Sequence, residues 1–116
     1  MADETLELSL LFDFFGDLLS EKQRDYFDLC FNDDMSLSEV SEVTGVSRQA
    51  VRDGLVAAKR QLREYEEKTG VVQRFMELRQ GLGSLEEKAQ ALADMTGGPA
   101  HRLALEILEG IGKLKG

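Results

Sequence analysis

A chain of 116 residues that is 42% hydrophobic and 31% charged is long enough to bury a core and too apolar to be disordered. Its one cysteine excludes an internal disulfide, which fits the reducing cytoplasm where we expect the protein to reside. The net charge of −8 argues against a nucleic-acid partner, because phosphate binding depends on Lys and Arg, unless the basic residues are gathered in one place.

The first predicted helix covers residues 6–19, where Leu and Phe occupy too much of the helix surface for a single apolar stripe. We therefore expect it to be buried on several sides, as the central helix of a bundle. It is too short to span a bilayer and carries Asp13 and Asp17, so no membrane insertion is expected. Gly16 lowers helix propensity, and the helix is expected to fray there.

Two capping boxes predict where the next two helices begin. Ser20 with Gln23 opens a helix that ends at the polar turn of residues 32–34, and Ser36 with Glu39 opens a shorter helix. The apolar positions expected to be buried are, on the first helix, Tyr26, Phe27, Cys30 and Phe31 and, on the second, Leu37, Val40 and Val43.

Thr44-Gly45-Val46 is expected to end the short helix, and Ser47 to cap a longer helix that reaches about Lys68. The packing seam of this longer helix is Val51, Leu55, Ala58, Leu62 and Tyr65. A short helix, a glycine-containing turn and a second helix are the pattern of a helix-turn-helix. The sequence therefore predicts a small all-α helical bundle with a helix-turn-helix from about Leu37 to Arg63.

Basic residues are concentrated in one short segment of an acidic chain. Residues 1–46 hold 12 acidic and 2 basic side chains, whereas residues 47–63 hold 5 basic side chains against Asp53 alone. At 100° per residue, four of these five basic side chains form one stripe about 20 Å long beside the packing seam. Such a stripe is either a surface for a polyanion or an ordinary solvated helix face.

In a helix-turn-helix the first residues of the second helix reach base edges in the major groove. Arginine suits guanine and glutamine suits adenine, while a serine beside free backbone amides suits a phosphate. The predicted nucleic-acid-binding residues are Ser47, Arg48, Gln49 and Arg52, with Lys59 and Arg63 farther along the helix toward backbone phosphates.

The C-terminal third is predicted to form three amphipathic helices. One ends near Gly81-Leu82-Gly83, a second is capped by Ser84 with Glu87, and a third follows Gly97-Gly98-Pro99. The last helix is expected to pack through Leu103, Ile107, Ile111 and Leu114. We divide the chain into a helix-turn-helix domain with its N-terminal bundle, residues 1–82, and residues 83–116. The second part either folds back on the same compact domain or forms a homodimer through a dimerisation tail.

No group of residues suggests catalysis, a metal site or a cofactor. Cys30 has no partner base and is expected to be core packing, and His101 is isolated. We therefore predict a non-enzymatic protein without a small-molecule substrate.

Two resemblances narrow the function. The stretch from Ser36-Leu-Ser-Glu-Val to Gly45-Val-Ser-Arg-Gln-Ala-Val resembles region 4 of sigma factors, a promoter-binding helix-turn-helix. Residues 6 to about 80 resemble the YlxM family through Leu11-Phe-Asp-Phe-Phe, Ser20-Glu-Lys-Gln-Arg, Asp33-Asp34-Met-Ser-Leu-Ser-Glu-Val, Val46-Ser-Arg-Gln-Ala-Val-Arg-Asp53 and Tyr65-Glu-Glu-Lys.

The YlxM resemblance implies a regulatory protein with a DNA-binding helix-turn-helix that takes part in the signal recognition particle pathway. The binding surface that this resemblance implies for the present chain runs from Ser47 to Asp53. The alternative that it leaves open is an accessory module of the signal recognition particle, which would bind the particle's RNA or its protein GTPase instead of DNA.

Overall fold

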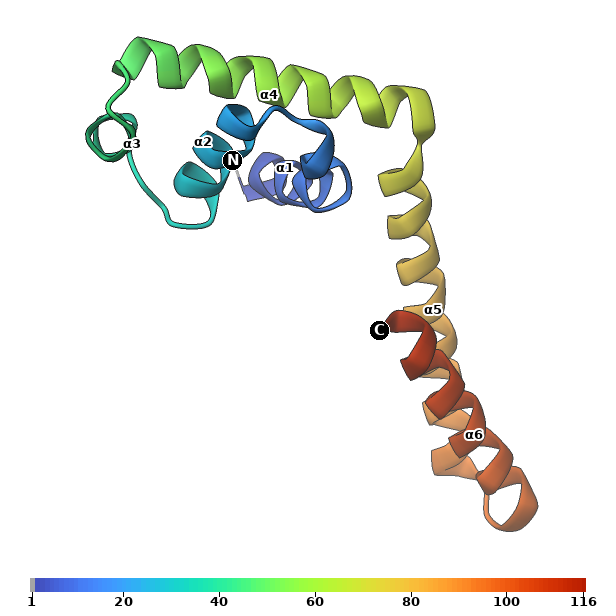
Figure 1. Cartoon of the computed structure of the whole chain (residues 1–116). Helices are drawn as coiled ribbons and strands as arrows, with labels where there is room; N and C mark the ends of the chain where they lie inside the picture. The colour runs from blue at the N-terminus through green and yellow to red at the C-terminus, as the bar shows by residue number, and fades with distance from the viewer. Residues whose placement is uncertain (1) are drawn as a thin grey trace. The chain divides into compact units, whose positions relative to one another are not determined.

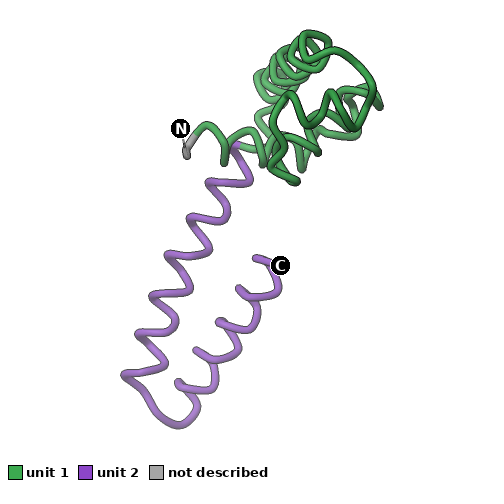
Figure 2. The backbone as a smooth tube through the Cα atoms, turned by 90° about the vertical axis from the view of Figure 1, so that its left-hand side faces the viewer, with its two compact units in different colours: residues 1–72 green, residues 73–116 purple. Residues whose placement is uncertain are grey.

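The computed structural model describes the backbone from Ala2 to Gly116 and the side chains from Glu4 onward. Every regular element in these residues is helical, as predicted (Figure 1). The elements are α1 (Ala2–Phe15), the 3₁₀ turn η1 (Gly16–Leu18), α2 (Glu21–Phe31), α3 (Leu37–Thr44), α4 (Arg48–Thr69), α5 (Val71–Met95) and α6 (Gly98–Lys115). The chain divides into two compact units, residues 1–72 and 73–116 (Figure 2).

In the first unit, α4 lies across α1, α2 and α3 and packs against all three (Figure 1). Its predicted seam is confirmed, since Val51, Leu55, Ala58 and Leu62 are buried and Tyr65 packs against them. The ring of Phe27 stacks on Phe12 and Phe31, with centroids 4.5 and 4.2 Å apart. The remaining buried residues of this core are Leu8, Leu11, Phe15, Leu19, Tyr26, Val40 and Val72.

The prediction that the first helix is buried on several sides is wrong. One side of α1 meets α2 and α4, while Leu6, Phe14 and Leu18 are exposed. The shared central element is α4, because α1, α2 and α3 all pack extensively against it. The α-helix stops at Phe15, and Gly16 starts the 3₁₀ turn.

Both capping boxes are present as predicted. The backbone N–H of Gln23 donates to Ser20 Oγ at 3.2 Å, and the backbone N–H of Glu39 donates to Ser36 Oγ at 3.2 Å. A serine cap contributes about 1 kcal/mol to helix stability. These caps fix where α2 and α3 begin, and α3 in turn positions the turn that follows it.

Gly54, in the middle of α4, has a packing role that the sequence does not reveal. A Cβ atom added there would lie 2.8 Å from Cδ2 of Tyr26 and 3.0 Å from its Cε2. Tyr26 is buried, so its ring has little free space into which to move. Glycine therefore lets α2 approach α4 closely.

We expect Gly54→Ala to lower the free energy of unfolding by about 1–2 kcal/mol, because overpacking outweighs the gain in helix propensity. Gly83→Ala is the matched control, since nothing beyond its chain neighbours and the backbone of its own helix lies within 4 Å of an added Cβ there. This control should raise stability by about 0.5–1 kcal/mol. Urea unfolding followed by circular dichroism measures both, and stabilisation by Gly54→Ala would contradict the packing role.

The second unit is an antiparallel hairpin of α5 and α6 (Figure 2). His101 Nδ1 lies 2.7 Å from the carbonyl oxygen of Ala93, and an Nη1 of Arg79 donates to the Lys115 carbonyl at 3.0 Å. Lys115 also pairs with Glu86 at 3.3 Å. The side chains buried in this unit are Leu82, Ala89, Ala93, Ala104 and Ile111.

Two expectations for this region are wrong. α5 runs unbroken through Gly81 and Gly83, so Ser84 lies inside a helix and caps nothing. Glycine costs a helix about 1 kcal/mol, but both glycines keep a right-handed backbone and the helix continues.

The packing face of the last helix was also predicted incorrectly. Ile111 is buried, whereas Leu103, Ile107 and Leu114 are exposed. α6 instead turns Ala104 and Leu108 toward α5 together with Ile111. The small alanine side chains allow the two helices to lie close together, which sequence spacing alone does not indicate.

Candidate nucleic-acid interface

The predicted helix-turn-helix is present, formed by α3, the turn of residues 45–47 and α4. Gly45 adopts the left-handed φ of +77° that the sharp turn requires, and Ser47 Oγ accepts the backbone N–H of Ala50 at 3.1 Å. Val40 and Val51, both fully buried, hold the two helices against each other. Val43 of α3 was also predicted to be buried, but this prediction is wrong, because the residue is 63% exposed.

Ser41 stabilises the turn in a way that the sequence did not indicate. Its hydroxyl donates to the Val46 carbonyl at 2.5 Å, five residues ahead. Alanine would leave that carbonyl without this donor. Ser41 is therefore a turn residue, whereas the sequence suggested only a small neutral side chain.

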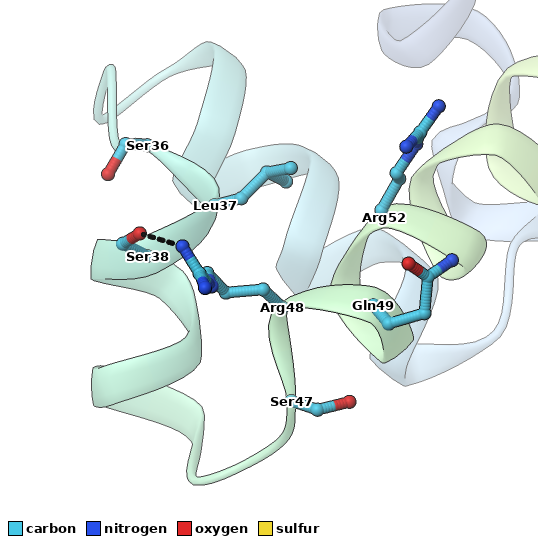
Figure 3. A pocket seen from close by; sticks show the side chains of 7 residues that line it. All are labelled: Ser36, Leu37, Ser38, Ser47, Arg48, Gln49 and Arg52. Carbon is cyan, nitrogen blue, oxygen red and sulfur yellow. Dashed lines mark hydrogen bonds between the residues drawn. The ribbon is translucent and has the colours of Figure 1, made fainter.

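An open hollow lies between the beginnings of α3 and α4 (Figure 3). Its lining comes from Ser36, Leu37 and Ser38 on one side and from Ser47, Arg48, Gln49 and Arg52 on the other. The structure thus brings together the four residues predicted to reach base edges, all of them exposed. The α3 residues of the lining were not predicted.

Arg48 and Arg52 present their charges without a carboxylate partner among the described residues. Arg48 reaches across to α3, where its Nη1 donates to Ser38 Oγ at 3.4 Å (Figure 3). Gln49 Nε2 donates to Asp53 Oδ1 at 2.9 Å, which leaves its amide oxygen and second proton for another partner. A hydrogen bond of 3.4 Å to an uncharged hydroxyl is weak, so Arg48 can readily exchange it for a guanine or a phosphate.

The structure does not bring Lys59 and Arg63 to this hollow. Arg63 lies three turns beyond Arg52 on α4, at a rise of about 16 Å. Its Nη2 pairs with Glu4 Oε1 at 3.3 Å, and Lys59 Nζ lies 5.5 Å from the ring centroid of Phe31. An exposed ion pair contributes at most about 1 kcal/mol, so a phosphate could displace Glu4.

Other chemistry finds little support in the described part of the chain. Burial raises the pKa of the Cys30 thiol, and the nearby charge of Lys59 opposes this effect. A raised pKa leaves less of the nucleophilic thiolate, which fits a packing role. No cluster of metal-ligating side chains occurs among the described residues, and none of their helices is both long and apolar enough to cross a membrane.

Comparison with known proteins identifies the family of this chain. The family model UPF0122, described as "Putative helix-turn-helix protein, YlxM / p13 like", matches residues 2–97. The chain belongs to the UPF0122 family. The match confirms the YlxM resemblance and spans the whole α3–α4 motif of this UPF0122 chain.

Individual UPF0122 relatives agree over most of the chain. The UPF0122 protein of Halalkalibacterium halodurans is 45% identical over 87 residues, which cover 75% of this chain and 80% of the relative. The one of Caldanaerobacter subterraneus subsp. tengcongensis is 41% identical over 75% of this chain and 74% of its own length. The one of Thermoanaerobacter sp. (strain X514) is 36% identical over 113 residues, which cover 97% of this chain and 94% of the relative.

Proposed function

We propose that this protein is a non-enzymatic regulator that binds duplex DNA through α3 and α4. The observation that carries the proposal is the exposed N-terminal turn of α4. There Arg48 and Arg52 flank an open hollow and have no carboxylate partner among the described residues. An acidic protein with two uncompensated arginines at the start of a recognition helix has one surface suited to a polyanion.

The residues that α4 and its cap contribute to the hollow each have a role in this proposal. Arg48 and Arg52 donate to guanine O6 and N7, and Gln49 donates and accepts at an adenine. Ser47 and the free backbone N–H groups of the first turn of α4 hold a phosphate, helped by the positive end of the helix dipole. Lys59 and Arg63 add phosphate contacts farther along the duplex, once Arg63 leaves Glu4.

The acidic remainder of the protein sets the expected strength of binding. Twelve acidic side chains in residues 1–46 repel phosphate, so non-specific affinity should be low and strongly dependent on salt. Base contacts must then supply most of the useful affinity. The resemblance of residues 36–51 to region 4 of sigma factors favours binding to a specific duplex sequence over non-specific binding along DNA.

Fluorescence anisotropy with a labelled duplex, titrated between about 50 and 200 mM salt, tests the proposal. With two to four phosphate contacts, log K should fall linearly with log salt at a slope of about −2 to −4. The YlxM resemblance associates the regulator with the signal recognition particle pathway, so the particle's RNA is the informative competitor. Stronger displacement by this RNA than by unlabelled duplex DNA would contradict the DNA proposal and indicate that the protein binds the particle's RNA instead.

A further inference from the structure

The hairpin of α5 and α6 exposes more large apolar side chains than it buries. Of its five buried residues, three are alanine, and only Leu82 and Ile111 are large. The large hydrophobic residues exposed between positions 73 and 116 are Met76, Leu78, Leu85, Leu92, Met95, Leu103, Leu105, Ile107 and Leu114. Chains of about 40 residues rarely bury enough apolar surface alone and usually need a metal, a cross-link or oligomerisation.

Six of these exposed side chains lie on one face of the hairpin. Leu78, Leu85 and Leu92 recur every seventh residue on α5, about 40–80° to one side of the line that faces α6. Leu103, Ile107 and Leu114 lie about 60–100° to the same side of the corresponding line on α6. Because the helices run antiparallel (Figure 2), offsets of the same sign place both sets on one face.

The register of the hairpin aligns these side chains in layers. The contacts between Ala93 and His101 and between Arg79 and Lys115 put Leu92 level with Leu103 and Leu78 level with Leu114. Leu85 and Ile107 lie between those two levels. We call these six residues the leucine face. A copy of the same face turned by a two-fold axis offers matching apolar layers along its whole length.

The charge of this unit also favours pairing with itself. Residues 73–116 hold six acidic and six basic side chains, so the entire net charge of −8 resides in residues 1–72. Two hairpins can therefore meet without net repulsion. The opposite side of the hairpin is mixed, because exposed Met76 and Leu105 lie there together with polar residues such as Gln90 and Asp94.

We propose that the leucine face binds the leucine face of a second copy of this chain, so that two hairpins form a four-helix bundle. The 18 residues of α6 give the face a length of about 27 Å, and two helices give it a width of about 20 Å. That footprint of roughly 500 Å², increased by the relief of the side chains, approaches the ~800 Å² per partner of a standard interface. If the proposed DNA binding holds, the dimer carries two recognition helices for paired half-sites.

The test is the mass of the full-length protein in solution, measured by sedimentation or light scattering. We expect twice the 12.9 kDa of one chain. The double variant Leu85→Glu/Ile107→Glu should raise the dissociation constant of the dimer at least about 100-fold, because carboxylates would meet across an apolar interface. Both side chains are exposed, at 54% and 50%, so the hairpin should keep its helical circular dichroism.

Met76→Glu/Leu105→Glu is the matched control. These side chains are 49% and 46% exposed, and they lie on the other side of the hairpin, so this variant should remain a dimer. A monomeric wild-type protein, or equal dimerisation of all three proteins, would overturn the inference. A monomer that binds DNA would contradict the dimer but support the proposed function. A dimer that does not bind DNA would contradict the proposed function but support pairing through the leucine face.

Discussion

Replacing Arg48 and Arg52 together with alanine is expected to weaken binding to duplex DNA at least about 30-fold. Each arginine that contacts a base or phosphate contributes about 1–3 kcal/mol, so the pair contributes 2 kcal/mol or more. Both side chains are exposed and make no ion pair among the described residues, so their removal should not unfold the protein. Anisotropy at constant salt measures the loss.

Lys88→Ala/Arg102→Ala is the control for this experiment. It also removes two positive charges, here from exposed positions in residues 73–116, and so changes the net charge by the same amount. We expect its affinity to stay within about threefold of wild type, because both charges belong to residues outside the α3–α4 motif that is proposed to contact DNA. Equal losses in the two double variants would show that net charge governs binding, and would contradict a specific role for α4.

Phe27→Ala is expected to be the most destabilising single substitution, at about 3–5 kcal/mol. The side chain is 1% exposed and stacks on both Phe12 and Phe31, so its removal leaves a cavity that joins α1 and α2. A unit of 72 residues has a total stability of only about 4–11 kcal/mol. The unit that contains the helix-turn-helix should therefore lose a large part of its free energy of unfolding.

Phe14→Ala removes the same side chain from a position that is 42% exposed. We expect it to cost less than about 1 kcal/mol, since most of the ring already meets solvent. Urea unfolding followed by circular dichroism compares the two variants. Similar midpoints for Phe14→Ala and Phe27→Ala would mean that the core is centred elsewhere.

The helix-turn-helix could be predicted from the sequence because its signals are local. Ser36 with Glu39 defines the start of α3, Gly45 defines its end, and Ser47 starts α4. Each signal acts through a hydrogen bond or a backbone angle within four residues. The same locality explains why the exposed cluster at Ser47, Arg48, Gln49 and Arg52 could be placed on one turn of helix.

The features that sequence analysis missed depend on neighbours distant in the chain. Spacing cannot show that Tyr26 lies against Gly54, or that Glu4 pairs with Arg63 across 59 residues. It also cannot decide which apolar side of an amphipathic helix is covered. For this reason Leu103, Ile107 and Leu114 were predicted to pack, whereas Ala104, Leu108 and Ile111 face α5.

The proposed DNA binding requires that the N-terminal turn of α4 contact the duplex. Its most direct test is amide chemical-shift mapping by NMR during titration with a duplex. We expect shifts concentrated at residues 36–38 and 47–53, around the hollow in Figure 3. Unchanged resonances in those two segments at saturating duplex, or shifts confined to α5 and α6, would contradict it.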